Sequence, residues 1–164
     1  MRGVLNSLYF LMFAAIAMVS AAMAEGSEKK DLLKLCEALS PQVQSGGSEI
    51  GGLRLDGTWT DADGKSPLDH TMVIERVTGN KVTLLYANGE QPAWYVKPEC
   101  TRHHGTYDES SQTITFQIQR RNDRVVVTYA LSADAADAKG TYVIIGGKWP
   151  GKFPGTFMRS KYGQ

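Results

Sequence analysis

The sequence has almost no net charge and, after its first 24 residues, no long apolar run. It carries 18 lysines and arginines against 17 aspartates and glutamates, and Arg2 is the only charged residue among the first 24. A nucleic-acid-binding surface usually leaves a basic excess, so the even balance excludes nucleic acid as a general partner. A membrane helix needs about 20 apolar residues, which excludes an integral membrane segment after those first residues.

Signatures of catalysis and metal binding are also scarce. The chain has only three histidines and no G-x-S-x-G sequence, the nucleophile motif of α/β-hydrolases. Cys100-x-x-His103 has the spacing of half a zinc motif, but the second half is missing. His103 and His104 would point to opposite faces of a strand. We therefore expect no metal, no cofactor and no catalytic residue, with a hydrolase-like enzyme built on Asp69-His70 as the third alternative.

The first 24 residues have the pattern of a secretory signal peptide. Arg2 supplies the positive end, Leu8–Met18 the apolar run, and Ala22-Met23-Ala24 the cleavage pattern. We expect cleavage before Glu25 and a periplasmic or secreted product. The expected organisation is a signal peptide over 1–24, a helix and Gly/Ser joint over 25–50, and a β-barrel domain over 51–164.

Cysteine occurs only twice, as Cys36 and Cys100. An exported chain meets an oxidising compartment, and two cysteines allow one intrachain pair. We therefore expect a Cys36–Cys100 disulfide. It would connect a helix expected within Ser27–Gln44, which Ser27 caps and Pro41 ends, to the sheet that follows.

From residue 51 onward the apolar residues alternate with polar ones, which predicts strands separated by short turns. The expected strands cover residues 53–60, 71–77, 81–87, 93–97, 103–108, 113–119, 124–132 and 140–146. Such short connections leave no room for helical crossovers and favour an antiparallel meander. Because open sheet edges are unfavourable, we expect an eight-stranded up-and-down barrel or half-barrel, with a sandwich as the alternative.

Aromatic residues fall within most of these strands, and most of them should belong to the core. Trp94 and Tyr95 are neighbours, so on a strand they would face opposite sides. A barrel mouth lined by such residues suits a small apolar or amphipathic ligand. The expected ligand-binding residues are Trp59, Met72, Arg76, Tyr86, Trp94, Tyr95 and Tyr129.

The segment Lys148–Gly155 repeats one phrase, Lys-aromatic-Pro-Gly. Pro followed by Gly is typical of type II turns, so we expect this tail to turn twice, not to form a regular central strand, and to cover one end of the barrel. Residues 156–162 would add a last strand. In the alternative, the tail binds an anionic surface of the cell envelope. Its binding residues would be Lys148, Trp149, Lys152 and Phe153.

Gly57-Thr58-Trp59, after a short helix and at the first strand, resembles the G-x-W of lipocalins and the G-T-W of avidin-like proteins, both calycin barrels. The resemblance implies that Trp59 packs across the barrel floor beside the helix. The resemblance covers a few residues and the number of strands, and it does not identify a ligand.

The sequence thus predicts an exported, non-catalytic barrel that binds a small apolar or amphipathic ligand. The alternative is an interaction module of the cell envelope, of the inhibitor or adaptor type, whose partner is an envelope protein or glycan.

Overall fold

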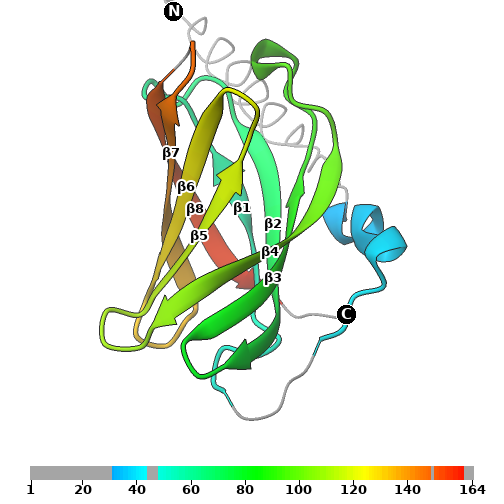
Figure 1. The fold of residues 1–164 in the computed structure, drawn as a ribbon, viewed down its shortest axis with the longest axis vertical. Helices are drawn as coiled ribbons and strands as arrows, with labels where there is room; N and C mark the ends of the chain where they lie inside the picture. The colour runs from blue at the N-terminus through cyan, green and yellow to red at the C-terminus, as the bar shows by residue number, and fades with distance from the viewer. Residues whose placement is uncertain (1–30, 44–47, 149, 161–164) are drawn as a thin grey trace, which may run out of the picture. The chain divides into compact units, whose positions relative to one another are not determined.

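Eight antiparallel strands form a closed up-and-down barrel, in which each strand pairs with the next and β8 pairs back with β1 (Figure 1). The computed structural model describes residues 31–43, 48–148 and 150–160. The strands are β1 Arg54–Trp59, β2 Leu68–Thr78, β3 Lys81–Asn88, β4 Glu99–Asp108, β5 Thr113–Gln119, β6 Asp123–Leu131, β7 Asp137–Gly146 and β8 Gly151–Ser160. The expected barrel is therefore confirmed in its closed form, which is compatible with a calycin-like fold. The expected signal peptide, Ser27, most of the Gly/Ser joint and Trp149 lie outside the described residues.

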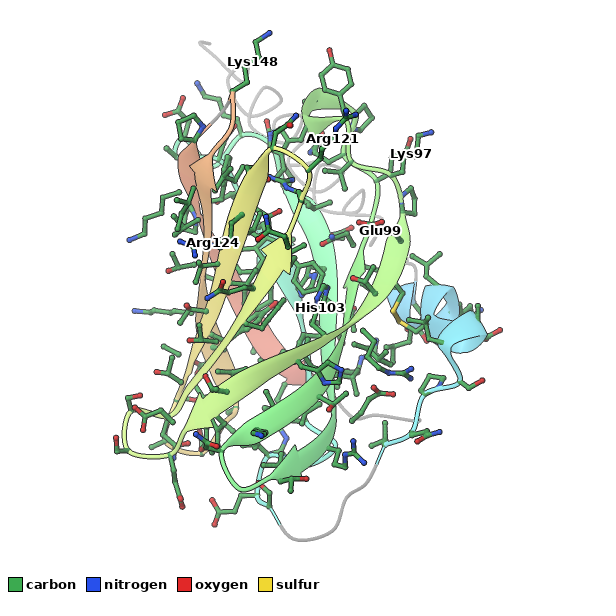
Figure 2. All side chains as sticks on the ribbon, in the orientation of Figure 1. Lys97, Glu99, His103, Arg121, Arg124 and Lys148 are labelled. Carbon is green, nitrogen blue, oxygen red and sulfur yellow. A yellow bond between two sulfur atoms is a disulfide. The ribbon has the colours of Figure 1, made fainter. Side chains whose placement is uncertain are left out.

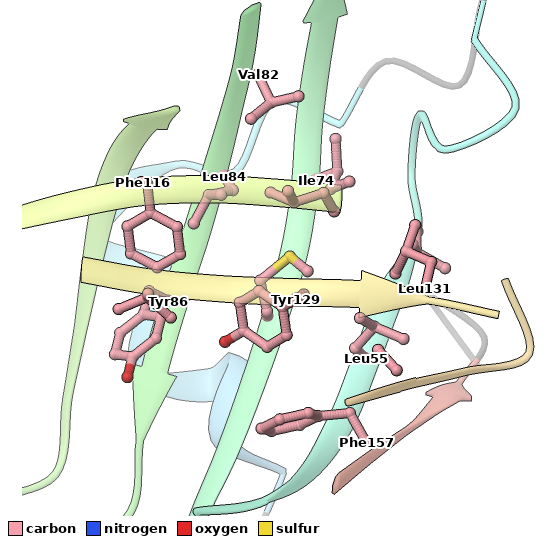
Figure 3. Close-up of a cluster of buried hydrophobic side chains, with 14 of the residues drawn as sticks. Leu55, Ile74, Val82, Leu84, Tyr86, Phe116, Tyr129, Leu131 and Phe157 are labelled. Carbon is pink, nitrogen blue, oxygen red and sulfur yellow. The ribbon is translucent and has the colours of Figure 1, made fainter. Parts of the chain in front are cut away.

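Alternation of side chains along the strands fills the middle of the barrel. In β6, Val125, Val127 and Tyr129 are fully buried, and the residues between them are more exposed. Tyr129 meets Phe116 of β5 and Phe157 of β8 in this aromatic layer (Figure 3). The barrel interior is thus a packed core at mid-height.

The expected strand over residues 93–97 is wrong. Pro92–Trp94 forms a short 3-10 helix, η2, and Tyr95 ends it in the left-handed conformation with φ of 57°. Pro92 suits the first helical position, where a missing N–H costs nothing, and the Gln91 side chain accepts from Ala93 N. This segment is therefore a structured loop between β3 and β4.

The two expected type II turns of the tail are also wrong, because β8 passes through Pro154-Gly155 as a strand between β7 and β1. Neither Gly151 nor Gly155 has a positive φ. The Pro154 carbonyl accepts from Thr60 N at 2.9 Å. The missing N–H of the proline therefore faces the end of β1, because N–H and C=O of one strand residue point to the same neighbour. No hydrogen bond to β7 is lost.

Gly155 is required by packing and not by turn geometry. A Cβ atom there would lie 2.5 Å from Cε3 of Trp59 and 2.7 Å from the Phe157 ring. Gly140, opposite it on β7, meets the same two rings. These glycines make the space that the buried Trp59 ring occupies. The helix that the resemblance places beside Trp59 packs in a different cluster.

The helix η1, Leu32–Leu39, packs on the outside of β2, β3 and β4. It is shorter than the expected helix and begins after Asp31, whose side chain accepts from Leu33 N. Its apolar face and the barrel wall form a second core, made by Leu32, Cys36, Val73, Leu85 and Ala87. The expected disulfide joins Cys36 to Cys100 of β4, with Cα atoms 5.2 Å apart. The helix therefore lies against the wall, in a cluster separate from that of Trp59.

An ion pair between the buried Glu75 and the exposed Arg102 fixes the chain after this helix. A β-bulge in β2 between Ile74 and Arg76 contains Glu75, whose carboxylate accepts from Arg102 Nε at 2.6 Å and from Gln42 N at 2.9 Å. Burial opposes ionisation of Glu75, but the hydrogen bonds from Arg102 and Gln42 outweigh it and lower the pKa. The Arg102 guanidinium also donates to the Leu39 carbonyl, which ties the helix end to the wall.

Candidate functional site

A cavity of about 410 Å³ lies at the end of the barrel where β1, β3, β5 and β7 end. Most of its lining is apolar or aromatic: Trp59, Leu68, Tyr86, Trp94, Tyr95, Val96, Tyr142, Ile144 and Phe153. Its polar lining consists of Asn88, Lys97, Glu99 and Arg120. A cavity of this size and composition is typical of a small-molecule site.

Trp59 and Tyr86 form the floor of the cavity and belong to the core. Their exposed fractions are 1% and 2%. The indole Nε1 of Trp59 and the hydroxyl of Tyr86 are buried, and neither forms a hydrogen bond of acceptable geometry to the described residues. In Figure 3 the Tyr86 hydroxyl points away from Phe116. Burial, and then Tyr142, raise the pKa of Tyr86 well above its ordinary value, and weak hydrogen bonds from the Trp59 and Asn88 side chains oppose the rise.

The mouth of the cavity is built from segments far apart in the sequence. The loop helix η2 carries Trp94 to within 5.3 Å of the Phe153 ring, between ring centroids. Phe153 in turn lies 6.1 Å from the Tyr142 ring of β7. The loop after β3 and the first residues of β8 therefore meet over the end of the barrel, and their aromatic rings form one wall of the cavity.

Charged groups surround the mouth and not the floor. Lys97 and Glu99 lie at the start of β4, at the end of the barrel that also carries Arg121 and Lys148 (Figure 2). Arg120 pairs with Asp123 at 2.5 Å in the β5–β6 turn. Burial raises the pKa of the Tyr142 phenol, while the Arg120 guanidinium opposes that rise. A ligand in this cavity would thus meet neutral groups inside and charges at the rim.

A histidine lies beside this floor in the core. His70 of β2 is 1% exposed, with Nδ1 3.1 Å from Asn88 Oδ1 and Nε2 2.6 Å from the Tyr129 hydroxyl. Because an amide oxygen only accepts, Nδ1 carries the proton, and Nε2 accepts from Tyr129. Burial lowers the pKa of His70 to about 3, although hydrogen bonds with Asn88 and Ala87 and the charge of Asp56 oppose the shift, so the ring is neutral at physiological pH.

The structure brings four of the expected ligand-binding residues to the cavity: Trp59, Tyr86, Trp94 and Tyr95. Met72 and Tyr129 are fully buried in the core and do not line it. Arg76 is exposed and lies in a surface groove with Lys81 and His104. Strict alternation from Met72 through Ile74 would point Arg76 inward, but the bulge at Glu75 shifts the register and turns it outward.

The expected tail residues do not form one surface. Phe153 turns into the cavity, while the neighbouring Lys152 is exposed on the outer face of β8. Lys148 is exposed at the same end of the barrel (Figure 2), and Trp149 lies outside the described residues. Pairing of β8 on both sides separates adjacent side chains, as in any strand.

Sequence reasoning missed Tyr142, Ile144 and Asn88 as cavity residues. Tyr142 and Ile144 follow the inward Gly140 of β7 at every second position, so the strand pattern places them on the same inward face. Asn88 precedes Gly89, and Asn-Gly is typical of turns, but Asn88 is the last residue of β3. Its inward position becomes clear only from its pairing with His70 of β2, which the neighbouring residues do not show.

The combinations considered for catalysis and metal binding are not assembled. Asp69 is exposed while His70 is buried, so the two point to opposite faces. Cys100 is in the disulfide, and His104 is exposed while His103 stacks on Phe116 inside, with ring centroids 5.1 Å apart. Burial, with His104 next to it, lowers the pKa of His103.

No known family model and no curated protein sequence matches this chain. Among the described residues, no helix is long and apolar enough to cross a membrane.

Because no described residue gives the Tyr86 hydroxyl a hydrogen bond of good geometry, we expect Tyr86→Phe to stabilise the protein. A buried polar atom without a partner costs about 1–3 kcal/mol, so the variant should raise the free energy of unfolding by about 1 kcal/mol. Urea unfolding measures it. Tyr129→Phe is the matched control, because it removes a hydroxyl that His70 uses and should be destabilising by about 1–2 kcal/mol. Equal losses in both variants would show that the Tyr86 hydroxyl is satisfied within the barrel.

Proposed function

We propose that this barrel is an exported, non-catalytic binding protein that holds a small apolar or amphipathic ligand in the cavity at the end of the strands. The observation that carries the proposal is the cavity of about 410 Å³ with an aromatic floor and wall. Its size lies within the range of about 300–1,000 Å³ usual for small ligands. The packed core beneath it gives such a site a rigid base.

The lining supports an amphipathic occupant. Apolar side chains such as Leu68, Val96 and Ile144 provide the surface that drives an apolar body out of water. Lys97 and Glu99 at the rim remain in reach of a polar end. The disulfide is consistent with an oxidising compartment, which together with the expected signal peptide supports export to the periplasm or beyond. The calycin-like architecture supports a binding role by analogy of fold alone.

A second candidate function, an interaction module of the inhibitor or adaptor type, is favoured by Tyr95. This side chain is 94% exposed on the left-handed residue that ends η2. Tyrosine is enriched among residues that dominate protein interfaces, and a structured loop presents it at little entropic cost. Tyr95→Ala should abolish a protein interaction, whereas Ile144→Trp, which fills the cavity, should leave that interaction intact, and this contrast separates the two functions.

The ligand-binding proposal predicts that filling the cavity abolishes binding of an apolar fluorescent probe. Ile144→Trp should weaken binding of N-phenyl-naphthylamine by at least about tenfold, equivalent to about 1.4 kcal/mol, because the indole occupies the probe's space. Thr106→Trp, exposed on β4 far along the strand from the cavity, is the control and should bind as the unmodified protein does. Probe fluorescence titration measures both.

Native mass spectrometry of the protein purified from its own host tests the same proposal without a chosen probe. A retained small molecule that is lost in Ile144→Trp supports ligand binding. Equal probe binding by both tryptophan variants, or none by the unmodified protein, would contradict it. A retained protein chain that Tyr95→Ala releases would instead favour the interaction module.

A further inference from the structure

Two buried hydrogen-bonding groups at the cavity floor, the Trp59 indole N–H and the Tyr86 hydroxyl, have no hydrogen-bond partner of good geometry among the described residues. Trp59 and Asn88 contribute only weak bonds to Tyr86. We propose that the ligand is a neutral ring compound whose carbonyl oxygen accepts hydrogen bonds from these two groups. This inference rests on the proposed function and specifies the chemical class that the same cavity takes.

The chemistry of the two groups defines what they need. An indole N–H can only donate. The Tyr86 phenol stays protonated, since burial raises its pKa well above the ordinary value, so it also has a proton to donate. A carbonyl oxygen has two lone pairs and can accept from both donors. A pure hydrocarbon would leave both donors unpaired, and an ammonium group would bring further donors.

The surroundings of the floor exclude a charged acceptor. His70, next to Tyr86 with ring centroids 4.1 Å apart, is neutral because burial lowers its pKa to about 3. The other groups that act on Tyr86 are Tyr142 and Glu99, which raise its pKa further, and the neutral Trp59 and Asn88, which lower it through hydrogen bonds. A ligand carboxylate placed at the floor would lose its hydration without a cation beside it, because the charged residues of the described lining, Lys97, Glu99 and Arg120, lie at the rim. A ketone, amide or lactone oxygen avoids this cost.

The walls favour a ring for the rest of the ligand. Trp94, Phe153 and Tyr142 form a connected series of rings at the mouth. Aromatic faces and edges pack well against flat rings. Both floor donors are shielded from solvent, so a ligand that reaches them requires rotation of side chains at the floor, which is common on binding.

Three matched probes test the inference on the purified protein. They are α-tetralone, a bicyclic ketone; tetralin, the same rings without oxygen; and the corresponding tetralin carboxylate. We expect α-tetralone to bind at least about tenfold more tightly than tetralin, and the carboxylate to bind most weakly. In the ¹⁵N spectrum, the assigned Trp59 indole N–H signal should move downfield with α-tetralone and stay nearly unmoved with tetralin.

Tyr86→Phe supplies the second arm. It should reduce the affinity for α-tetralone about tenfold and leave that for tetralin unchanged. Tyr107→Phe is the control, because this hydroxyl bonds to Gln112 beyond the opposite end of β4, and it should change neither affinity.

The outcomes separate this inference from the proposed function. Equal affinities for α-tetralone and tetralin, or a Trp59 signal that does not respond to the ketone, would overturn the carbonyl inference while ligand binding stands. Failure of all three probes and of N-phenyl-naphthylamine to bind would overturn both. Tightest binding of the carboxylate would show that the site prefers an anion, and would overturn the neutral class.

Discussion

Acidification from about pH 7 to about pH 4.5 is expected to lower the free energy of unfolding, with about 2.5 kcal/mol of the loss due to His70 alone. The reason is that this ring is neutral and fully buried, and its pKa falls from 6.5 to about 3 on folding. Its two nitrogens are already used by Asn88 and Tyr129. The folded protein therefore resists a proton that the unfolded chain accepts readily.

The sign follows from proton binding in the two states. Below about pH 6.5 the unfolded chain holds the proton and the folded chain does not, so stability decreases as the pH falls, by up to about 1.4 kcal/mol per pH unit. The stabilisation is complete above the unfolded pKa and is lost down to the folded pKa near 3. His103 adds a smaller effect of the same sign, because burial lowers its pKa too. Glu75, with its lowered pKa, adds to the loss only at lower pH.

Urea unfolding at a series of pH values measures this dependence. His70→Gln removes the titrating group and should flatten the curve between about pH 6.5 and 4.5, whatever its effect on absolute stability. His103→Gln should keep most of the slope. An unchanged slope in His70→Gln would show that the histidine is protonated in the folded protein or reaches solvent.

Much of the barrel could be predicted from the sequence because its strands have one buried and one exposed face. β5 has the predicted bounds, Thr113–Gln119, since Ile114 and Phe116 alternate cleanly with polar residues and turn residues flank them. The disulfide was also predictable, because two cysteines permit only one pair. These are local patterns or simple counts, and tertiary structure did not override them.

The failures occur where long-range packing overrides local preference. Pro154-Gly155 has turn chemistry, but Trp59, far away in the sequence, requires a residue without a side chain at 155. Residues 93–97 look like an apolar strand, but Pro92 and the Gln91 cap form a helical turn instead. The neighbouring residues in the sequence do not predict which side chain packs against a glycine, or which conformation a loop adopts.

The candidate site was predictable only in part for the same reason. Alternation pointed Trp59 and Tyr86 inward, and both are in the floor. His70 lies between the buried Leu68 and Met72 on the same face of β2, so its burial follows from alternation once the strand is taken to begin at Leu68. The Trp59 indole and the Tyr86 hydroxyl lack well-placed hydrogen-bond partners in the part of the chain that the structure describes. This depends on atoms from several strands, so no sequence pattern predicts it.

Removal of the Cys36–Cys100 disulfide is expected to lower the free energy of unfolding by about 4 kcal/mol, as the loop-closure model gives for this separation of 64 residues. The effect arises mainly in the unfolded chain, which gains freedom when the loop opens. Urea unfolding of the Cys36→Ser/Cys100→Ser double variant measures it. Reduction of the unmodified protein is the matched control, because it opens the bond without changing the chain, and both should give the same loss. Equal midpoints with and without the bond would contradict the expectation.

The folded state should change little when the bond opens, because a second anchor holds the helix. Glu75 still accepts from Arg102 and Gln42, and Arg102 still donates to the helix end at Leu39. Proteolysis within residues 31–43 under native conditions should therefore remain slow in the reduced protein. Rapid cleavage there would mean that the helix undocks and uncovers the apolar wall around Val73 and Leu85. The loss of stability would then exceed about 4 kcal/mol, since buried apolar area is lost in addition to loop closure.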